Sequence, residues 1–170
     1  DLIENGLTGW RLRSPEGENH WDAKNGTLTN SGVGSDLVST SVHDDFRLEA
    51  EYSYPSGSNS GIYLRGRYEF QIIDDYGKDP TVGSSGAIYG FAEPTNNAVK
   101  PAGDVAVIEL VGRLVTVTLN GVCVIERFEI PGITGGAMDS DEGAPGPILL
   151  QGDHGPVTFH RLVLPPIAHQ

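Results

Sequence analysis

The chain has 170 residues, and 23 acidic against 11 basic side chains give it a formal net charge of −12 at pH 7. This balance excludes a basic surface of the kind that binds nucleic acid or anionic membranes. The apolar runs are all far shorter than the roughly 18–20 residues that a membrane-spanning helix needs. The length predicts one domain over residues 1–170. No leader with a basic and then an apolar part opens the chain, so an export signal was either removed or never present.

Glycine and proline, with 23 and 11 copies, punctuate the chain, and the short segments between them are typical of β-strands. Asn25-Gly26 and Asn120-Gly121 each predict a two-residue hairpin turn, because both central residues of such a turn take positive φ angles. Residues 46–53 alternate apolar with polar side chains, which indicates a half-buried strand. Further strands are expected at 62–64, 68–73, 87–91, 105–111, 114–119, 122–128, 148–151 and 157–164. The sequence therefore predicts an all-β fold, an antiparallel β-sandwich or jelly roll.

Polar side chains recur at odd positions in residues 58–77, where two strands flank a turn near Gly66. The odd positions are Tyr63, Arg65, Glu69 and Gln71, and the even positions beside them are apolar. Directly opposed residues share a face in an antiparallel pair, so one polar face requires partners whose numbers sum to an even value, such as Arg65 opposite Glu69. That register requires a three-residue loop or a bulge. Two readings stay open here: a sugar-binding face, or an ordinary solvated face with a weak ion pair.

Four further features carry candidate chemistry. Glu51 has the same polar parity on the preceding strand, and His154 follows Asp153 in a glycine-flanked turn between two expected strands. Tyr89 is either a platform for a sugar ring or a plug at the end of the sandwich. Cys123 stands between two valines and is expected to be buried.

An acidic cluster marks the loop near residue 140. Its alternating carboxylates, Asp139, Asp141 and Glu142, are candidate oxygen ligands for Ca²⁺ or another divalent cation. The spacing is not that of a helix-loop-helix calcium site, and acidic surface loops are common, so an ordinary solvated loop is the alternative.

Motifs in a fixed order along the chain resemble the 3-keto-disaccharide hydrolase domain family. The motifs are Asn5-Gly6-Leu7-Thr8-Gly9-Trp10, Ser58-Asn59-Ser60-Gly61-Ile62-Tyr63-Leu64-Arg65-Gly66, Gly86-Ala87-Ile88-Tyr89-Gly90, Lys100-Pro101-Ala102-Gly103 and Leu150-Gln151-Gly152-Asp153-His154-Gly155. The resemblance covers nearly the whole chain. It implies a concanavalin A-like jelly roll, a bacterial origin, and a secreted or periplasmic location.

The resemblance also implies an activity on glycosides that are oxidised at C3. A ketone at C3 acidifies the hydrogen on C2, so a base can remove it and the C1 aglycone can leave by β-elimination; addition of water completes a net hydrolysis. This chemistry needs a base, a donor for the enolate oxygen and an acid for the leaving group. A carbohydrate-binding module that recognises terminal sugars on the same concave face is the alternative function.

The resemblance assigns candidate roles to residues of this chain. The expected catalytic residues are Glu69, His154 and Arg65, and Glu69 and Glu51 are each either a base or an acceptor for sugar hydroxyl groups. The expected substrate-binding residues are Glu51, Tyr63, Gln71, Tyr89, Lys100 and Asp153. One departure stands out, because Asp104 is followed by Val105 where similar proteins commonly carry a Trp, and this change is expected to alter or widen the sugar site.

Overall fold

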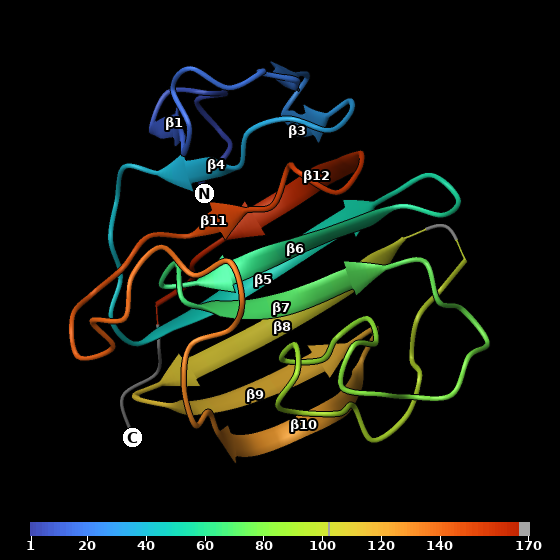
Figure 1. Ribbon diagram of the computed structural model, residues 1–170. Helices are drawn as coiled ribbons and strands as arrows, with labels where there is room; N and C mark the ends of the chain where they lie inside the picture. Colours follow the sequence, from blue (N-terminus) through green and yellow to red (C-terminus); the bar gives the residue numbers. More distant parts are fainter. Residues whose placement is uncertain (102, 167–170) are drawn as a thin grey trace.

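Two antiparallel β-sheets stack face to face in a computed structural model that describes residues 1–101 and 103–166 (Figure 1). The strands are Trp10–Leu12 (β1), Trp21–Lys24 (β2), Thr27–Asn30 (β3), Leu37–Ser39 (β4), Phe46–Ser53 (β5), Asn59–Leu64 (β6), Tyr68–Ile73 (β7), Asp104–Val111 (β8), Leu114–Leu119 (β9), Val122–Glu129 (β10), Leu149–Leu150 (β11) and Val157–Val163 (β12). The described residues form no helix, and hence none that is long and apolar enough to cross a membrane.

The strand order is that of a jelly roll. The five-stranded sheet runs β1-β4-β11-β6-β7, and the seven-stranded sheet runs β10-β9-β8-β5-β12-β3-β2. Strands that are distant in sequence therefore become neighbours, as with β11, which pairs with β4 on one side and β6 on the other. The predicted all-β sandwich is confirmed.

The hydrophobic core fills the space between the sheets. On β5, Leu48, Ala50 and Tyr52 are buried and point inward, as the alternating pattern predicts. On the facing sheet, Ile62 and Phe70 pair across β6 and β7 and are fully buried. The even positions of these two strands thus form the core, and the odd positions are left for the outer face.

Both predicted hairpins are confirmed. Asn25, Gly26, Asn120 and Gly121 all have positive φ angles, and Leu119 pairs with Val122 across the second turn. The prediction of a strand at 87–91 is wrong. This segment is a loop, and a single isolated bridge pairs its Ile88 with Phe70 on β7.

The prediction that Cys123 is buried is also wrong. Its side chain is exposed on β10, which pairs with β9 and forms an edge of the seven-stranded sheet. Cys123 pairs with Thr118, and the register shifts between Cys123 and Ile125. This irregularity interrupts the alternation, so Val122 and Cys123 are both exposed while Val124 is buried.

The β6–β7 hairpin has the predicted loop length. Tyr63 pairs with Glu69 and Leu64 with Tyr68, which leaves the three residues from Arg65 to Arg67 in the turn. Tyr63 and Glu69 are therefore opposite one another on the outer face of the five-stranded sheet, with Gln71 next along the same face. The expected pairing of Arg65 with Glu69 is wrong, because Arg65 lies in the turn beyond the strand, and its φ of 54° is in the left-handed region.

One long connection crosses the outer face of this sheet, and a second runs along its edge (Figure 1). The segment between β10 and β11 crosses the β6–β7 turn, where Met138 N donates to Gly66 O and Thr134 N donates to Arg67 O. The segment after β7 runs along the free edge of that strand, where Tyr89 N donates to Glu69 O. Side chains on the outer face therefore lie at the bottom of a hollow.

Candidate functional site

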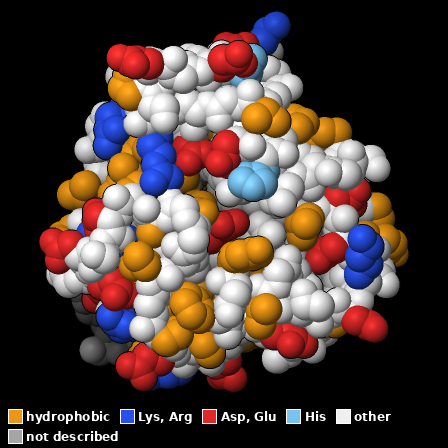
Figure 2. Space-filling model, in the orientation of Figure 1, with side chains coloured by type: hydrophobic (Ala, Val, Ile, Leu, Met, Phe, Trp, Pro, Cys, Tyr) orange, Lys and Arg blue, Asp and Glu red, His pale blue; other side chains and the backbone are white. Residues whose placement is uncertain are grey.

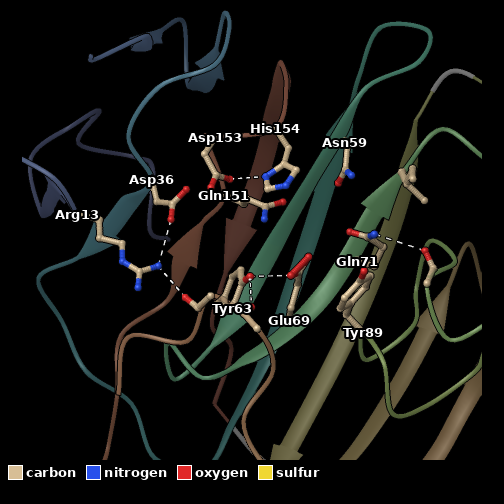
Figure 3. A pocket seen from close by; sticks show the side chains of 14 residues that line it. Arg13, Asp36, Asn59, Tyr63, Glu69, Gln71, Tyr89, Gln151, Asp153 and His154 are labelled. Atoms are coloured by element: carbon tan, nitrogen blue, oxygen red, sulfur yellow. Dashed lines mark hydrogen bonds and ion pairs between the residues drawn. The ribbon is translucent and has the colours of Figure 1, made fainter. Parts of the chain in front are cut away.

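A cavity of about 470 Å³ opens on the outer face of the five-stranded sheet. Figure 2 shows acidic side chains and a histidine around this hollow, and Figure 3 shows the side chains that line it. The lining residues come from β6, β7, the two long connections, the β11–β12 connection and the segments that follow β1 and precede β4. The volume is within the range of about 300–1,000 Å³ typical of small-molecule sites.

Glu69 lies at the bottom of the cavity and is only 5% exposed. Its side chain occupies the space above Gly61 on the neighbouring strand, where a Cβ would lie 3.1 Å from Glu69 Cγ. Gly61 therefore leaves room for the carboxyl group, which a side chain at that position would displace. The sheet thus holds one carboxyl group in a fixed, nearly buried position that faces the cavity.

Tyr63 is the main partner of this carboxyl group. Its hydroxyl oxygen lies 2.7 Å from Glu69 Oε2 and 2.7 Å from Gly135 O. A phenol hydroxyl has one hydrogen, so Tyr63 cannot donate to Gly135 O and to Glu69 at the same time. When Glu69 is protonated, it donates to the Tyr63 oxygen, and the Tyr63 hydrogen is free to bond Gly135 O. When Glu69 is ionised, the Tyr63 hydrogen turns to the carboxylate. Proton uptake by Glu69 is thereby coupled to the rotation of one hydroxyl group.

Burial raises the pKa of Glu69 above its usual range, and the nearby Asp153 and Asp36 raise it further. The hydrogen bond from Tyr63 and the charge of His154 act in the opposite direction. Burial likewise raises the pKa of Tyr63 well above its ordinary value, so this phenol remains protonated. A carboxyl with a raised pKa is a stronger base once ionised, which suits it to general base catalysis.

His154 and Asp153 lie on the opposite wall of the cavity, and His154 Nδ1 contacts Asp153 Oδ1 (Figure 3). Their turn is fixed by buried hydrogen bonds, because Asn30 Nδ2 donates to the carbonyls of Gly152 and Gly155. The Asp153 contact leaves Nε2 of the imidazole free to face the cavity. His154 is half exposed.

Arg13 and Asp36 complete the cavity wall, and sequence reasoning missed both. Arg13 Nη1 donates to Gly136 O at 2.7 Å and lies 3.3 Å from Asp36 Oδ2. Asp36 Oδ1 accepts from Gly152 N at 2.8 Å, directly before the Asp153–His154 pair. Burial raises the pKa of Asp36. Arg13 directly follows β1 and Asp36 directly precedes β4. Neither residue lies in a motif or in an alternating pattern.

Gln71 lies beside Glu69, as the sequence predicts for the polar face, and Tyr89 lines the same cavity. With its amide turned so that both ends are satisfied, Gln71 donates to Ser60 O at 3.0 Å and to Glu69 Oε1 at 3.2 Å. Tyr89 is at the rim, 45% exposed, and its backbone is tied to the carbonyl of Glu69. An exposed aromatic ring held rigidly beside a polar pocket is a suitable platform for a sugar ring.

The structure corrects the position expected for Arg65. Its guanidinium group is 3% exposed and points away from the cavity, where Nε donates to Asp44 O, Nη1 to Gly112 O and Nη2 to Asp45 Oδ1. The positive φ at Arg65 ends the strand alternation, so odd numbering no longer places the side chain on the outer face. Arg65 joins the loop between β4 and β5 to the β8–β9 turn.

Glu51 and Lys100 are also outside the cavity. Glu51 is on β5 of the seven-stranded sheet and is exposed on the outer face of that sheet. Together with Lys100 it lines a separate depression of about 310 Å³. The parity of Glu51 is the expected one, but parity within a strand does not determine which sheet the strand joins. Glu69 is therefore the remaining candidate base of the two.

The acidic cluster near residue 140 is not assembled as a metal site. Among the described residues, no group of three or more His, Cys, Asp or Glu side chains is arranged to hold a metal ion. Asp139 pairs with Arg67 Nε at 2.7 Å, and this hydrogen bond lowers the pKa of Asp139. Glu142 accepts from Tyr68 and pairs with Arg113 at 2.9 Å. The carboxylates of these two residues are each engaged by an arginine.

The departure at Val105 does not affect the cavity. Val105 is 47% exposed on β8, and it borders the depression that contains Glu51 and Lys100. The expectation that this position widens the sugar site is wrong for the cavity around Glu69.

The raised pKa of Glu69 predicts a pH dependence of stability. A carboxyl whose pKa is higher in the folded chain stabilises the fold fully below its unfolded pKa of about 4.3, and this contribution is lost as the pH rises through the folded value. Relative to Glu69→Gln, the wild-type free energy of unfolding should therefore fall as the pH rises above about 4. Urea unfolding of both proteins between about pH 4 and pH 8 measures this difference, and parallel curves would contradict it.

The fold and the site define a jelly-roll domain of the glycosyl hydrolase-like or carbohydrate-binding kind. The sequence matches the family of the 3-keto-alpha-glucoside-1,2-lyase-like domain over residues 2–164. The chain belongs to this family. A comparison with curated proteins finds no match.

Solved structures share the fold of this chain. A protein from Parabacteroides distasonis ATCC 8503, described as a candidate glycosyl hydrolase, is 29% identical, with a TM-score of 0.74 over 92% of this chain and 78% of the other. The carbohydrate-binding module CBM66 from Bacillus subtilis is 14% identical, with a TM-score of 0.60 over 91% and 93% of the two chains. The β-glucanase of Bacillus licheniformis is 12% identical, with a TM-score of 0.60 over 96% and 95%. The last two share only the fold.

Proposed function

We propose that this domain cleaves 3-keto-glycosides by β-elimination between C1 and C2, with Glu69 as the base. The observation that carries the proposal is the Glu69 carboxyl itself, which is nearly buried at the bottom of a sugar-sized cavity with a pKa raised by burial. A site that only recognises hydroxyl groups gains nothing from a carboxyl that is costly to ionise. A base gains proton affinity from the same environment.

The reaction begins when the Glu69 carboxylate removes the proton on C2 of the bound keto sugar. The electron pair of the C2–H bond forms a C2=C3 double bond, and the negative charge moves to the C3 oxygen. Arg13 is the lining residue with a permanent positive charge, and it is the donor we assign to this oxygen. Once Glu69 has taken up the proton, the Tyr63 hydroxyl no longer donates to the carboxyl group and donates to Gly135 O instead.

The second step breaks the bond between C1 and the aglycone oxygen. The enolate re-forms the C3 ketone, a C1=C2 double bond appears, and the leaving oxygen takes a proton from His154. Asp153 holds Nδ1 of the imidazole, so that Nε2 is the atom which delivers the proton. Water that adds to C1 of the enone afterwards gives the free 3-keto sugar, which makes the overall reaction a hydrolysis.

A carbohydrate-binding module is the second candidate function. The exposed ring of Tyr89 beside several polar side chains favours it, because aromatic stacking with hydrogen bonds to hydroxyl groups suffices for recognition. Under this alternative, Glu69 accepts a hydrogen bond from sugar and takes no proton from carbon.

Aglycone release from a 3-keto-glucoside tests the proposal. We expect the wild-type protein to release 4-nitrophenol from 4-nitrophenyl 3-keto-α-glucoside and to leave the unoxidised glucoside intact, because only the ketone acidifies C2–H. The assay is run with and without added Ca²⁺, Mn²⁺ or Zn²⁺. Binding of both sugars without release from either, over a panel of aglycones and both anomers, would favour the binding module.

A further inference from the structure

Gln151 lines the cavity with a buried amide oxygen that has no hydrogen-bond donor. The residue is 6% exposed, and no donor in residues 1–101 or 103–166 reaches its Oε1 atom. A buried acceptor without a donor is costly, and native proteins rarely keep one without a function. Oε1 itself is covered, but the Gln151 side chain lies on the cavity wall, so a ligand toward which the terminal amide turns can supply the missing donor.

The sheet places Gln151 in register with the carboxyl of Glu69. Gln151 N donates to Gly61 O at 2.9 Å, and Ser60 Oγ donates to Gln151 O at 2.8 Å, so the backbone extends the β11–β6 pairing by one residue. Gly61 in turn pairs with Gln71 on β7. Gln151, Gly61 and Gln71 thus form one row across three strands.

Glu69 occupies the gap in this row. Because Gly61 has no side chain, the Glu69 carboxyl lies above it, between the two amides (Figure 3). The amides differ in what they leave free. The Gln71 amide donates to Ser60 O and to Glu69 Oε1, whereas Gln151 Oε1 has no hydrogen-bond partner among the described residues. Under the proposed function, Glu69 takes the proton from C2 of the sugar. The amides that flank Glu69 therefore lie next to the other substituents of C2.

We propose that Gln151 is a substrate-binding residue whose amide oxygen accepts a hydrogen bond from the C2 hydroxyl group of the sugar. This inference rests on the proposed function, which places C2 at Glu69. A hydroxyl group is a donor, and the ketone oxygen at C3 is not, so a free acceptor beside the base selects the hydroxyl. The substrate class is then a 3-keto-glycoside with an intact 2-hydroxyl, and 2-deoxy sugars are poor substrates.

The test compares 4-nitrophenyl 3-keto-α-glucoside with its 2-deoxy counterpart in the wild type and in Gln151→Met, which removes the acceptor and keeps the chain length. We expect the variant to lose about tenfold in kcat/KM on the 2-hydroxy substrate, the value of one hydrogen bond, and less than about twofold on the 2-deoxy substrate. For each substrate, kcat/KM of the variant is divided by kcat/KM of the wild type. This ratio removes the difference in intrinsic reactivity between the two sugars. Asn96→Met, at an exposed amide outside the cavity, is the matched control and should change neither value.

A second variant separates a substrate-binding role of Gln151 from a structural one. Gln151→Glu keeps an acceptor oxygen and should retain the preference for the 2-hydroxyl, whereas a purely structural role predicts equal losses on both sugars in both variants.

A binding measurement separates failure of this inference from failure of the proposed function. If the wild type releases no aglycone from either sugar, the proposed function fails. Calorimetric binding of the methyl 3-keto-glucoside and its 2-deoxy analogue then decides the role of Gln151. Equal affinities, or binding of neither sugar, overturn the inference.

Discussion

Replacing Glu69 with Gln should lower kcat for aglycone release by about 10³-fold, within the range of about 10²–10⁴ for a positioned general base. The amide keeps the shape of the carboxyl group above Gly61 and keeps an oxygen for the Tyr63 hydroxyl. It cannot take up a proton. Because the contacts to the sugar remain, the dissociation constant of the methyl 3-keto-glucoside should change less than about fivefold, so catalysis and recognition separate in this variant.

Glu126→Gln is the matched control for this experiment. Glu126 is exposed on β10 of the seven-stranded sheet, outside the cavity, and the same substitution there should leave kcat unchanged. Stopped assays of 4-nitrophenol release measure both variants, and calorimetry measures sugar binding. A Glu69→Gln protein that binds sugar and turns it over at the wild-type rate would remove Glu69 from the chemistry.

Arg65→Met should lower the free energy of unfolding by about 2–4 kcal/mol, the scale for the loss of several buried hydrogen bonds. The guanidinium donates to two backbone carbonyls, of Asp44 and Gly112, and to the Asp45 carboxylate, and it is almost completely buried. Methionine fills part of the volume but donates nothing. Because Arg65 points away from the cavity, kcat of the folded variant should stay within about threefold of the wild-type value.

Arg47→Met provides the comparison for stability. Arg47 is 42% exposed on β5 and lies 3.7 Å from Glu49, a surface pair whose removal should change stability by no more than about 0.5 kcal/mol. Thermal and urea unfolding measure both variants. If Arg65→Met instead unfolds like the wild type and loses activity selectively, Arg65 acts on the substrate after all.

The sequence was sufficient for the fold class and for part of the site. Alternation within Phe46–Ser53, the Asn-Gly turns and the even-sum register of the β6–β7 hairpin are local properties, since each depends on φ angles and on which face a residue occupies. The same local rules placed Tyr63, Glu69 and Gln71 on one face. The glycine-flanked Asp153–His154 turn was recognisable from its motif, which also contains Gln151.

The errors have a common origin in applying a local rule beyond its range. Arg65 has the parity of the polar face, but its positive φ redirects the side chain after the strand ends. Glu51 has that parity as well, yet its strand belongs to the other sheet. Cys123 has apolar neighbours, but β10 is an irregular edge strand that exposes it.

By itself, then, the sequence determined an all-β sandwich and a polar face that carries Tyr63, Glu69 and Gln71, because hydrogen-bonded neighbours and alternation act over a few residues. Only the tertiary structure decided what surrounds that carboxyl. The sheet order inserts β11 between β4 and β6, and this brings Asp36 and Arg13 from one end of the chain to the Asp153–His154 turn near the other. Such pairings follow from how two whole sheets bury their apolar faces against each other, a property that no single segment contains.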